Sequence, residues 1–228
     1  KGAWADNQYT GHTAGDWTVR AVYEGRVDSA SLRVAPAAPS YLRVSPNVAT
    51  VIAGEVQAYT VEAFDTYDNA LGDVTGDTAF AIVEAGHSGN WMDNAYTAQA
   101  AGAWTVRGTY AGQQADATLT VNPATLSYIR ISPESTTLTA GEEQAYVAEA
   151  FDRYDNPLGD VTAAAIFRIL QDGHNGRWRG RSYTAHTAGT WTVQALYRGL
   201  TDDAALAVEP GELSYIVASP DAASAVAG

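Results

Sequence analysis

The 228-residue chain has no cysteine and a single lysine, Lys1. Without cysteine, disulfides, thiol nucleophiles, iron–sulfur clusters and cysteine-ligated zinc are excluded. The lack of any further lysine excludes a Schiff-base lysine, a phosphate-loop lysine and the internal Lys–Asn isopeptide cross-links of some surface adhesins. No apolar run approaches the roughly 18 residues that a membrane-spanning helix needs, and no Asn-x-Ser/Thr glycosylation sequon occurs.

Basic residues are also few, since 13 of them stand against 26 acidic ones, a formal net charge of −13. A surface of this sign repels the phosphate backbone of nucleic acids and anionic lipid headgroups. We therefore expect no nucleic-acid partner and no membrane insertion of this segment. The 46% apolar and 10% aromatic content is that of a folded chain rather than a disordered one.

An internal repeat of 87 residues organises the chain. The heptapeptide at Ser40–Pro46 returns at Ser127–Pro133 and in part at Ser214–Pro220. All six tryptophans occupy two positions of this period: Trp4, Trp91 and Trp178, and Trp17, Trp104 and Trp191. Residues 40–126 and 127–213 thus form two complete repeats that are identical at roughly half of their positions.

The terminal segments match only parts of a repeat. Residues 1–39 match its second part, and residues 214–228 match its beginning, the first strand or strands of a further repeat. One interpretation is a segment cut from a longer array, and the other is head-to-tail completion between molecules, as in donor-strand assembly. The two ends together cover 54 of 87 positions and lack two strands of core, which favours the longer array.

Each repeat shows the period-2 alternation of half-buried strands and no helical period. The clearest strand is Trp104–Tyr110, in which Trp104, Val106 and Tyr110 share one face. The turn Ala111-Gly112 and a second alternating strand around Leu119 follow it, and we expect a hairpin in all three copies. About seven strands in 87 residues is the number and length of a β-sandwich, so the fold class is all-β.

The run Phe64–Thr75, and more closely Phe151–Thr162 with its Asn156-Pro157, resembles the "D-x-x-G-N-P…V" segment of bacterial immunoglobulin-like repeats of the invasin/intimin kind (Big-like). The opening Ser132-Pro133 to Ala140-Gly141 and the ending Tyr183–Val193 are similar to such repeats too. Asp68 and Asp155 stand where that family usually has glycine. The resemblance implies tandem immunoglobulin-like sandwiches in a secreted or surface-anchored protein.

An acidic cluster in each complete repeat is the first candidate for chemistry: Asp65, Asp68, Asn69 and Asp73, and the equivalent Asp152, Asp155, Asn156 and Asp160. Calcium takes six to eight oxygens from such side chains, but the EF-hand spacing is absent. Asp and Asn also bond their own backbone in tight turns. The sequence favours the turn and leaves calcium as the alternative.

Tryptophan and histidine are the remaining candidates. Trp104 and Trp191 share a face with valines and are predicted to be core; Trp91 and Trp178 are predicted to be core as well, with an exposed sugar-binding rim as the alternative. The four histidines are His12, His87, His174 and His186. They have no further metal-ligand residues nearby in sequence, so we interpret them as solvated.

No nucleophile elbow and no His-Glu-x-x-His motif occurs, so the sequence predicts no enzyme, no catalytic or metal residues and no cofactor. The repeats, short linkers and lack of chemical motifs favour an extracellular or cell-surface structural and adhesive array: a stalk, a filament or a surface layer. Its expected partners are other copies of itself or a cell-surface or matrix target. The alternative function is a carbohydrate-binding accessory module of a larger secreted protein.

Overall fold

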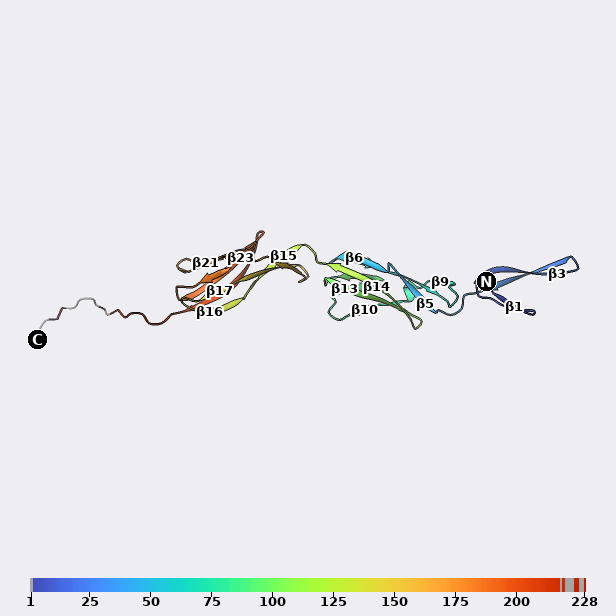
Figure 1. The fold of residues 1–228 in the computed structure, drawn as a ribbon, viewed down its shortest axis with the longest axis horizontal. Coiled ribbons are helices and arrows are strands. Elements are labelled where there is room, and N and C mark those ends of the chain that lie inside the picture. Colours follow the sequence, from blue (N-terminus) through green and yellow to red (C-terminus); the bar gives the residue numbers. More distant parts are fainter. Residues whose placement is uncertain (1, 218, 220–223, 226–227) are drawn as a thin grey trace. The chain divides into compact units, whose positions relative to one another are not determined.

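The computed structural model describes residues 2–217, 219, 224–225 and 228. This part of the chain folds into 24 strands and one 3-10 turn, Thr75–Asp77, and contains no α-helix. It therefore holds no helix long and apolar enough to cross a membrane. The chain divides into two compact units, Lys1–Ala124 with Tyr154–Asn156, and Thr125–Arg153 with Pro157–Gly228 (Figure 1).

The first unit begins with two antiparallel hairpins. They are β1 (Ala3–Ala5) with β2 (Gln8–Thr10), and β3 (Gly15–Tyr23) with β4 (Arg26–Val34). Glu24 and Gly25 turn the second hairpin with φ of 45° and 80°, the left-handed conformation that glycine favours. Each hairpin is a two-stranded sheet, and large apolar side chains such as Trp4 and Tyr23 remain exposed.

Residues 41–122 of the first unit form a sandwich. One layer has the orders β5–β8–β9 and β11–β12–β7, where the strands are β5 (Tyr41–Ser45), β7 (Val56–Ala58), β8 (Thr60–Phe64), β9 (Ala70–Asp73), β11 (Gly89–Met92) and β12 (Ala95–Ala98). The other layer has the order β10–β13–β14–β6, where the strands are β6 (Val48–Ile52), β10 (Ala79–Ile82), β13 (Gly102–Tyr110) and β14 (Gln113–Asn122). The pair β6–β14 is parallel, and every other pair is antiparallel.

The second unit repeats this order in residues 126–209. Its first layer contains β15–β18–β19 and β17–β22–β21: β15 (Leu126–Ser132), β17 (Glu143–Ala145), β18 (Val147–Asp152), β19 (Pro157–Asp160), β21 (Arg177–Arg179) and β22 (Ser182–Thr184). Its second layer contains β16–β24–β23–β20: β16 (Ser135–Thr139), β20 (Ile166–Ile169), β23 (Gly189–Tyr197) and β24 (Leu200–Glu209).

The inward faces of the alternating strands make one core per sandwich. Tyr59, Val61, Val106 and Leu119 are fully buried in the first sandwich, and Tyr146, Ala148, Val193 and Leu206 occupy the equivalent positions of the second. Burial of this apolar surface stabilises each sandwich, because it removes the inward side chains from water while the outward ones stay hydrated.

The predicted fold class is confirmed: the chain is all-β, with tandem immunoglobulin-like sandwiches. The strands are shorter and more numerous than the expected seven, with ten in residues 41–122, because β5 and β6 join different layers and Tyr59 separates β7 from β8. The repeat boundaries at 39/40, 126/127 and 213/214 stay predictions. Residues 214–217 form no strand, and 218, 220–223 and 226–227 of the predicted last segment lie outside the described residues.

Candidate functional site

The loop after β8 is built around Asp65, whose side chain is only 1% exposed. Its Oδ1 accepts hydrogen bonds from the backbone N–H groups of Tyr67 and Asn69, which is the geometry of an Asx turn. Its Oδ2 accepts bonds from the Asn69 side chain and from the N–H of Ala37 in the preceding linker. Burial alone would raise the pKa of Asp65, but these four donors together lower it to about 2.

Asn69 extends this loop to the hairpin region at the start of the chain. Its Nδ2 donates to the carbonyl oxygen of His12, and its Oδ1 accepts from the N–H of Ala14, both at 2.8 Å. The ring of His12 stacks on Tyr67, with centroids 4.5 Å apart and planes 11° from parallel. Residues 12–14 are therefore held by an amide that satisfies a backbone donor and a backbone acceptor at once.

The same pair of hydrogen bonds recurs 87 residues later, also within the first unit. Asn156 is 6% exposed, donates to the carbonyl oxygen of Gln99 at 2.8 Å and accepts from the N–H of Ala101 at 2.7 Å. Gln99 stands where the first copy has His12, so the contact depends on backbone groups and tolerates a change of side chain. We define these two asparagines, with the backbone groups they bind, as the junction site.

An aromatic and cationic cluster flanks the Asp65 loop. The Arg43 guanidinium carbon lies 4.3 Å from the ring centroid of Phe64, a cation–π distance. Tyr41 stacks on Phe64 and donates its hydroxyl to Asp68 at 2.7 Å. The hydrogen bond to Asp68 is the main reason why the pKa of Tyr41 is raised. Asp68 has a φ of 62°, which accounts for the glycine that the resembling repeats have here.

The three carboxylates of the first acidic cluster have separate partners. Asp65 is surrounded by N–H donors, Asp68 accepts from Tyr41, and Asp73 Oδ1 accepts from the N–H of Thr75 at 2.8 Å. In turn, Thr75 Oγ1 accepts from the N–H of Val61 and so ends the strand pairing beside β9. Within the described residues, no group of three or more His, Cys, Asp or Glu is placed to hold a metal ion. The hydrogen bonds of Asp65 are those of the predicted turn.

The tryptophans of the complete repeats pack against the cores. Trp91 lies 4.9 Å from Tyr96 and 5.4 Å from Phe80 between ring centroids, and Trp178 has equivalent neighbours. The indole N–H of Trp104 donates to the carbonyl oxygen of Ala100, as those of Trp17 and Trp191 do to Thr13 and Thr187. These contacts support the prediction that the four tryptophans of the complete repeats, Trp91, Trp104, Trp178 and Trp191, pack against the cores.

Two histidines have structural partners that the sequence did not indicate. His87 Nδ1 lies 3.1 Å from the hydroxyl of buried Tyr96, and His174 Nδ1 lies 2.7 Å from that of Tyr183. These histidines are 9 residues from their tyrosines and provide the hydrogen bond that a buried hydroxyl needs. The sequence signal that could have indicated this contact is that both complete repeats have a histidine 9 residues before the tyrosine, at the 87-residue period. His87 is exposed, as expected of a solvated side chain, and His174 is partly buried; the hydrogen bond to tyrosine is what the sequence did not indicate.

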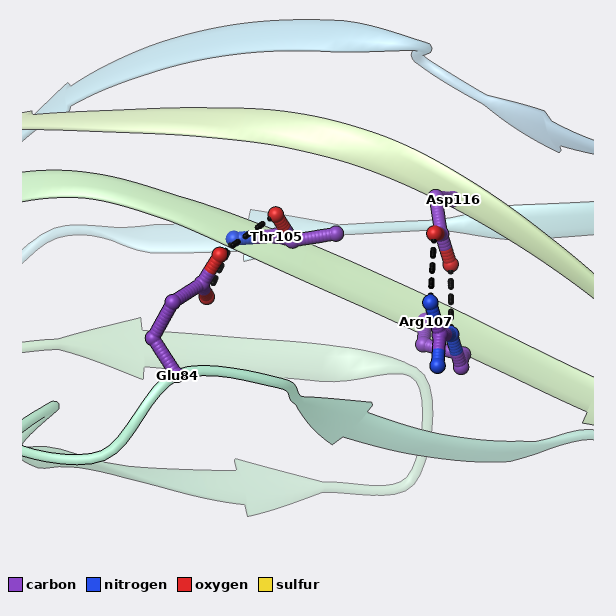
Figure 2. A network of polar contacts seen from close by, with 4 residues as sticks. All are labelled: Glu84, Thr105, Arg107 and Asp116. Atoms are coloured by element: carbon purple, nitrogen blue, oxygen red, sulfur yellow. Dashed lines mark hydrogen bonds and ion pairs between the residues drawn. The ribbon is translucent and has the colours of Figure 1, made fainter.

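Polar contacts link the segment after β10 to β13, and β13 to β14, in the second layer of the first sandwich (Figure 2). Glu84 accepts from the N–H and the hydroxyl of Thr105 on β13, and these bonds lower the pKa of Glu84. Arg107 on β13 forms a two-bond ion pair with Asp116 on β14, both at 2.7 Å. The charge of Asp116 is thereby neutralised within the sheet.

No protein-family model and no curated protein matches the chain. Among solved structures, surface layer protein SbsC (domains 4–9) has 15% identity and a TM-score of 0.31, covering 86% of this chain and 35% of that one. The titin Ig tandem A164–A165 has 13% identity and a TM-score of 0.33, covering 77% and 99%. Invasin, described as a bacterial integrin-binding protein, has 17% identity and a TM-score of 0.38, covering 89% and 47%.

This chain therefore spans about a third of the length of the SbsC structure and about half of that of invasin. At identities of 13–17%, these likenesses concern the fold alone.

Proposed function

We propose that this chain is a non-enzymatic structural or adhesive array of immunoglobulin-like repeats, located outside the cell or on its surface. It would serve in a stalk, a filament or a surface layer. The observation that carries the proposal is the junction site, since the same two backbone hydrogen bonds recur at Asn69 and Asn156. A repeat that binds backbone groups of preceding residues is suited to fixing the geometry of an array rather than to binding a small molecule.

The Asp65 loop supports this role because it restrains the linker as well. Ala37 lies between Pro36 and Pro39, and its N–H is held by Asp65 Oδ2 at 2.9 Å. Proline restricts the backbone of such a segment, and the carboxylate removes much of the remaining freedom. Both features oppose swinging of residues 1–39 against the sandwich that follows them.

The test replaces Asn69 and Asn156 by alanine and measures small-angle X-ray scattering of the whole chain. We expect an unchanged circular dichroism spectrum and a broader distribution of interatomic distances within the molecule, because each replacement removes the two hydrogen bonds of the junction site, of about 1 kcal/mol each. Asn69→Ala also removes the bond to Asp65 Oδ2. Asn90→Ala is the control, since Asn90 is exposed on strand β11 and outside the junction site. Scattering of the double variant identical to that of the wild type would contradict the proposed restraint.

The carbohydrate-binding alternative requires tryptophan rings that are open to solvent in the complete repeats. Trp91 and Trp178 are half-buried and packed against Phe80 and Phe167. Acrylamide quenching of single-tryptophan variants separates the two functions. Quenching of Trp91 that a soluble glycan relieves would favour binding, whereas weak quenching with no glycan effect is the result that we expect.

A further inference from the structure

A groove of about 800 Å³ opens on the first sandwich beside strand β5. Its walls include Val44 on β5, Glu62 on β8, Asp73 on β9, and Ala115 and Asp116 on β14. Strand β5 pairs with β8 on one side and is the outer strand of its sheet. The groove therefore follows an open strand edge, the kind of surface to which another strand can add.

The backbone N–H group of Val44 is directed toward this groove. Val44 faces Val61 in the antiparallel pair, and the N–H of Val61 turns away from β5 to bond Thr75 Oγ1. In an antiparallel ladder both N–H groups of such a pair point outward, so the Val44 N–H points away from β8. A strand laid along β5 would find this donor available at the centre of the edge.

The second sandwich closes the same position with a carboxylate. Asp202 Oδ2 on β24 accepts from the N–H of Ile131 on β15 at 2.7 Å, spanning the two layers. Ile131 is the equivalent of Val44, and Asp202 is the equivalent of Ala115 at the 87-residue period. The methyl group of Ala115 cannot accept a hydrogen bond, so the first sandwich lacks this closure.

The charge of the groove is negative. Residues 40–126 contain nine acidic and two basic residues. Arg107 is paired with Asp116 (Figure 2). Arg43 also lines the groove, where it stacks on Phe64 and donates to the Tyr41 hydroxyl, so one cation stands there against the carboxylates of Glu62, Asp73 and Asp116. Glu62 and Asp73 are exposed on the groove wall, and a cationic strand edge would complement them.

The second unit presents such an edge. Strand β21 is the outer strand of the sheet β17–β22–β21; Arg177 and Arg179 are exposed on it and Arg181 in the turn after it, while Trp178 faces the core. The equivalent positions of the first unit, on β11 and in the turn after it, have the uncharged Asn90, Met92 and Asn94. The two repeats therefore differ at two places: one has the open acidic groove and the other the basic edge.

We propose that the β21 edge of one copy of this chain docks in the β5 groove of a second copy. The groove and the edge are different surfaces of each copy, so the contact is heterologous and joins copies head to tail, into a ring or an open filament. This inference names the partner of the array and rests on the proposed structural function. The net charge of −13 opposes the contact over long distances, but at about 0.15 M salt that repulsion is screened beyond about 8 Å while direct ion pairs persist.

The test compares two double variants of the full chain by sedimentation equilibrium at about 0.15 M and about 1 M salt. Arg177→Asn with Arg179→Met gives β21 the residues of β11, which the fold already accommodates. Arg168→Ala with Arg198→Ala removes two charges elsewhere, again taking the residues of the first repeat, Ala81 and Ala111. We expect about tenfold weaker association for the first variant and wild-type association for the second, with all association weakened at high salt.

A third variant, Ala115→Asp, separates docking on the strand edge from general electrostatics. It introduces the carboxylate that Asp202 provides in the second sandwich and adds a negative charge to the groove. Closure of the edge predicts loss of association, whereas charge alone predicts a gain. A gain with Ala115→Asp, or equal association of both arginine variants, would overturn the proposal.

One further outcome bears on the identity of the partner. A wild-type chain that stays monomeric but binds a polyanion such as heparin through Arg177 and Arg179 would overturn the second-copy assignment. The junction variants at Asn69 and Asn156 report on the array itself and leave both docking surfaces unchanged. Their result therefore separates a failure of the docking proposal from a failure of the proposed function.

Discussion

Asp65 and Asn69 form one hydrogen-bonded pair that serves two purposes. The Asn69 amide donates to Asp65 Oδ2 at 2.8 Å and, with its other hydrogen, to the carbonyl oxygen of His12 at 2.8 Å. The carboxylate fixes the orientation of the amide, and the amide holds residues 12–14. In the part of the chain that the structure describes, this buried carboxylate has no ion-pair partner, and it is tolerated because four N–H donors surround it.

The first prediction concerns acid. The folded-state pKa of Asp65 is about 2, below its ordinary value of 3.8, so its ionised form is favoured by folding. Its contribution to stability is complete above pH 4 and is lost as the pH falls from about 4 to about 2. Asp65→Asn removes this titration, so its urea midpoint should fall less steeply than that of the wild type across this range, from a lower starting value at pH 7.

The measurement is a series of urea unfolding curves between pH 2 and pH 6, followed by tryptophan fluorescence. Asp77→Asn is the control, because Asp77 is exposed in the 3-10 turn and outside the Asp65 loop. Parallel pH dependences for Asp65→Asn and the wild type would show that this carboxylate does not stabilise the folded state.

The second prediction concerns two buried tyrosines of the same core. Within the described residues the Tyr59 hydroxyl has no hydrogen-bond partner, whereas that of Tyr96 meets His87. Tyr59→Phe should raise the free energy of unfolding by about 1 kcal/mol, because it removes an unsatisfied buried group. Tyr96→Phe should lower it by about 0.5–1.5 kcal/mol, because it removes the hydrogen bond between the Tyr96 hydroxyl and His87. Equal effects in urea would refute the distinction.

Alkaline pH gives an independent measure of the same site. Burial raises the pKa of Tyr59 to about 12, so folding favours the protonated phenol. The corresponding stability is present below pH 10 and is lost as the pH rises from 10 to about 12. Tyr59→Phe should therefore lose less stability than the wild type in this window.

The sequence predicted the architecture well because the repeat supplied its own comparison. Alternation around Trp104 and Val106 identified the hairpin β13–β14, and glycine at 112 identified its turn. The turn at Asp65 was predictable too, since its donors at Tyr67 and Asn69 are local. Contacts within a few residues leave a signal in composition and spacing.

The junction contacts were not predictable for the opposite reason. Asn69 binds the backbone of His12 and Ala14, more than 50 residues away, and backbone groups carry no sequence signature. The division of the start of the repeat into β5 and β6 in different layers was missed as well, although the buried positions shift from Leu42 and Val44 to Ala49 and Val51 between the two strands. The open groove at Ala115 became visible only when the structure placed β14 beside β5.

The third prediction uses the natural replacement of Glu84. Its equivalent, Gln171, accepts from the N–H of Thr192 at 2.8 Å and donates its Nε2 to the Thr192 hydroxyl at 2.9 Å, so it bonds the same two groups that donate to Glu84 in Thr105. Glu84→Gln should therefore leave the urea midpoint nearly unchanged, whereas Glu84→Ala should lower it, because the N–H of Thr105 loses its acceptor. Comparable loss in both variants would show that the negative charge, rather than the hydrogen bonds, is required.

The fourth prediction concerns Gly102, which has a φ of 149° and lies under the indole of Trp104. An added Cβ would lie 3.1 Å from the Trp104 ring in a backbone conformation that other residues rarely adopt. Gly102→Ala should therefore lower the free energy of unfolding by about 1–3 kcal/mol. Gly76→Ala is the matched control: a Cβ there meets nothing within 4 Å, and the second repeat has Ala163 at this position.

Gly76→Ala should leave stability unchanged or raise it by up to about 1 kcal/mol, because alanine restricts the unfolded chain. Urea unfolding and near-ultraviolet circular dichroism of the tryptophans measure both variants. The Gly102 variant should also change the tryptophan spectrum, since the indole must shift from its bond to Ala100. If both the spectrum and the stability were unaltered, the close contact between Gly102 and the Trp104 indole would not be the reason for glycine at this position.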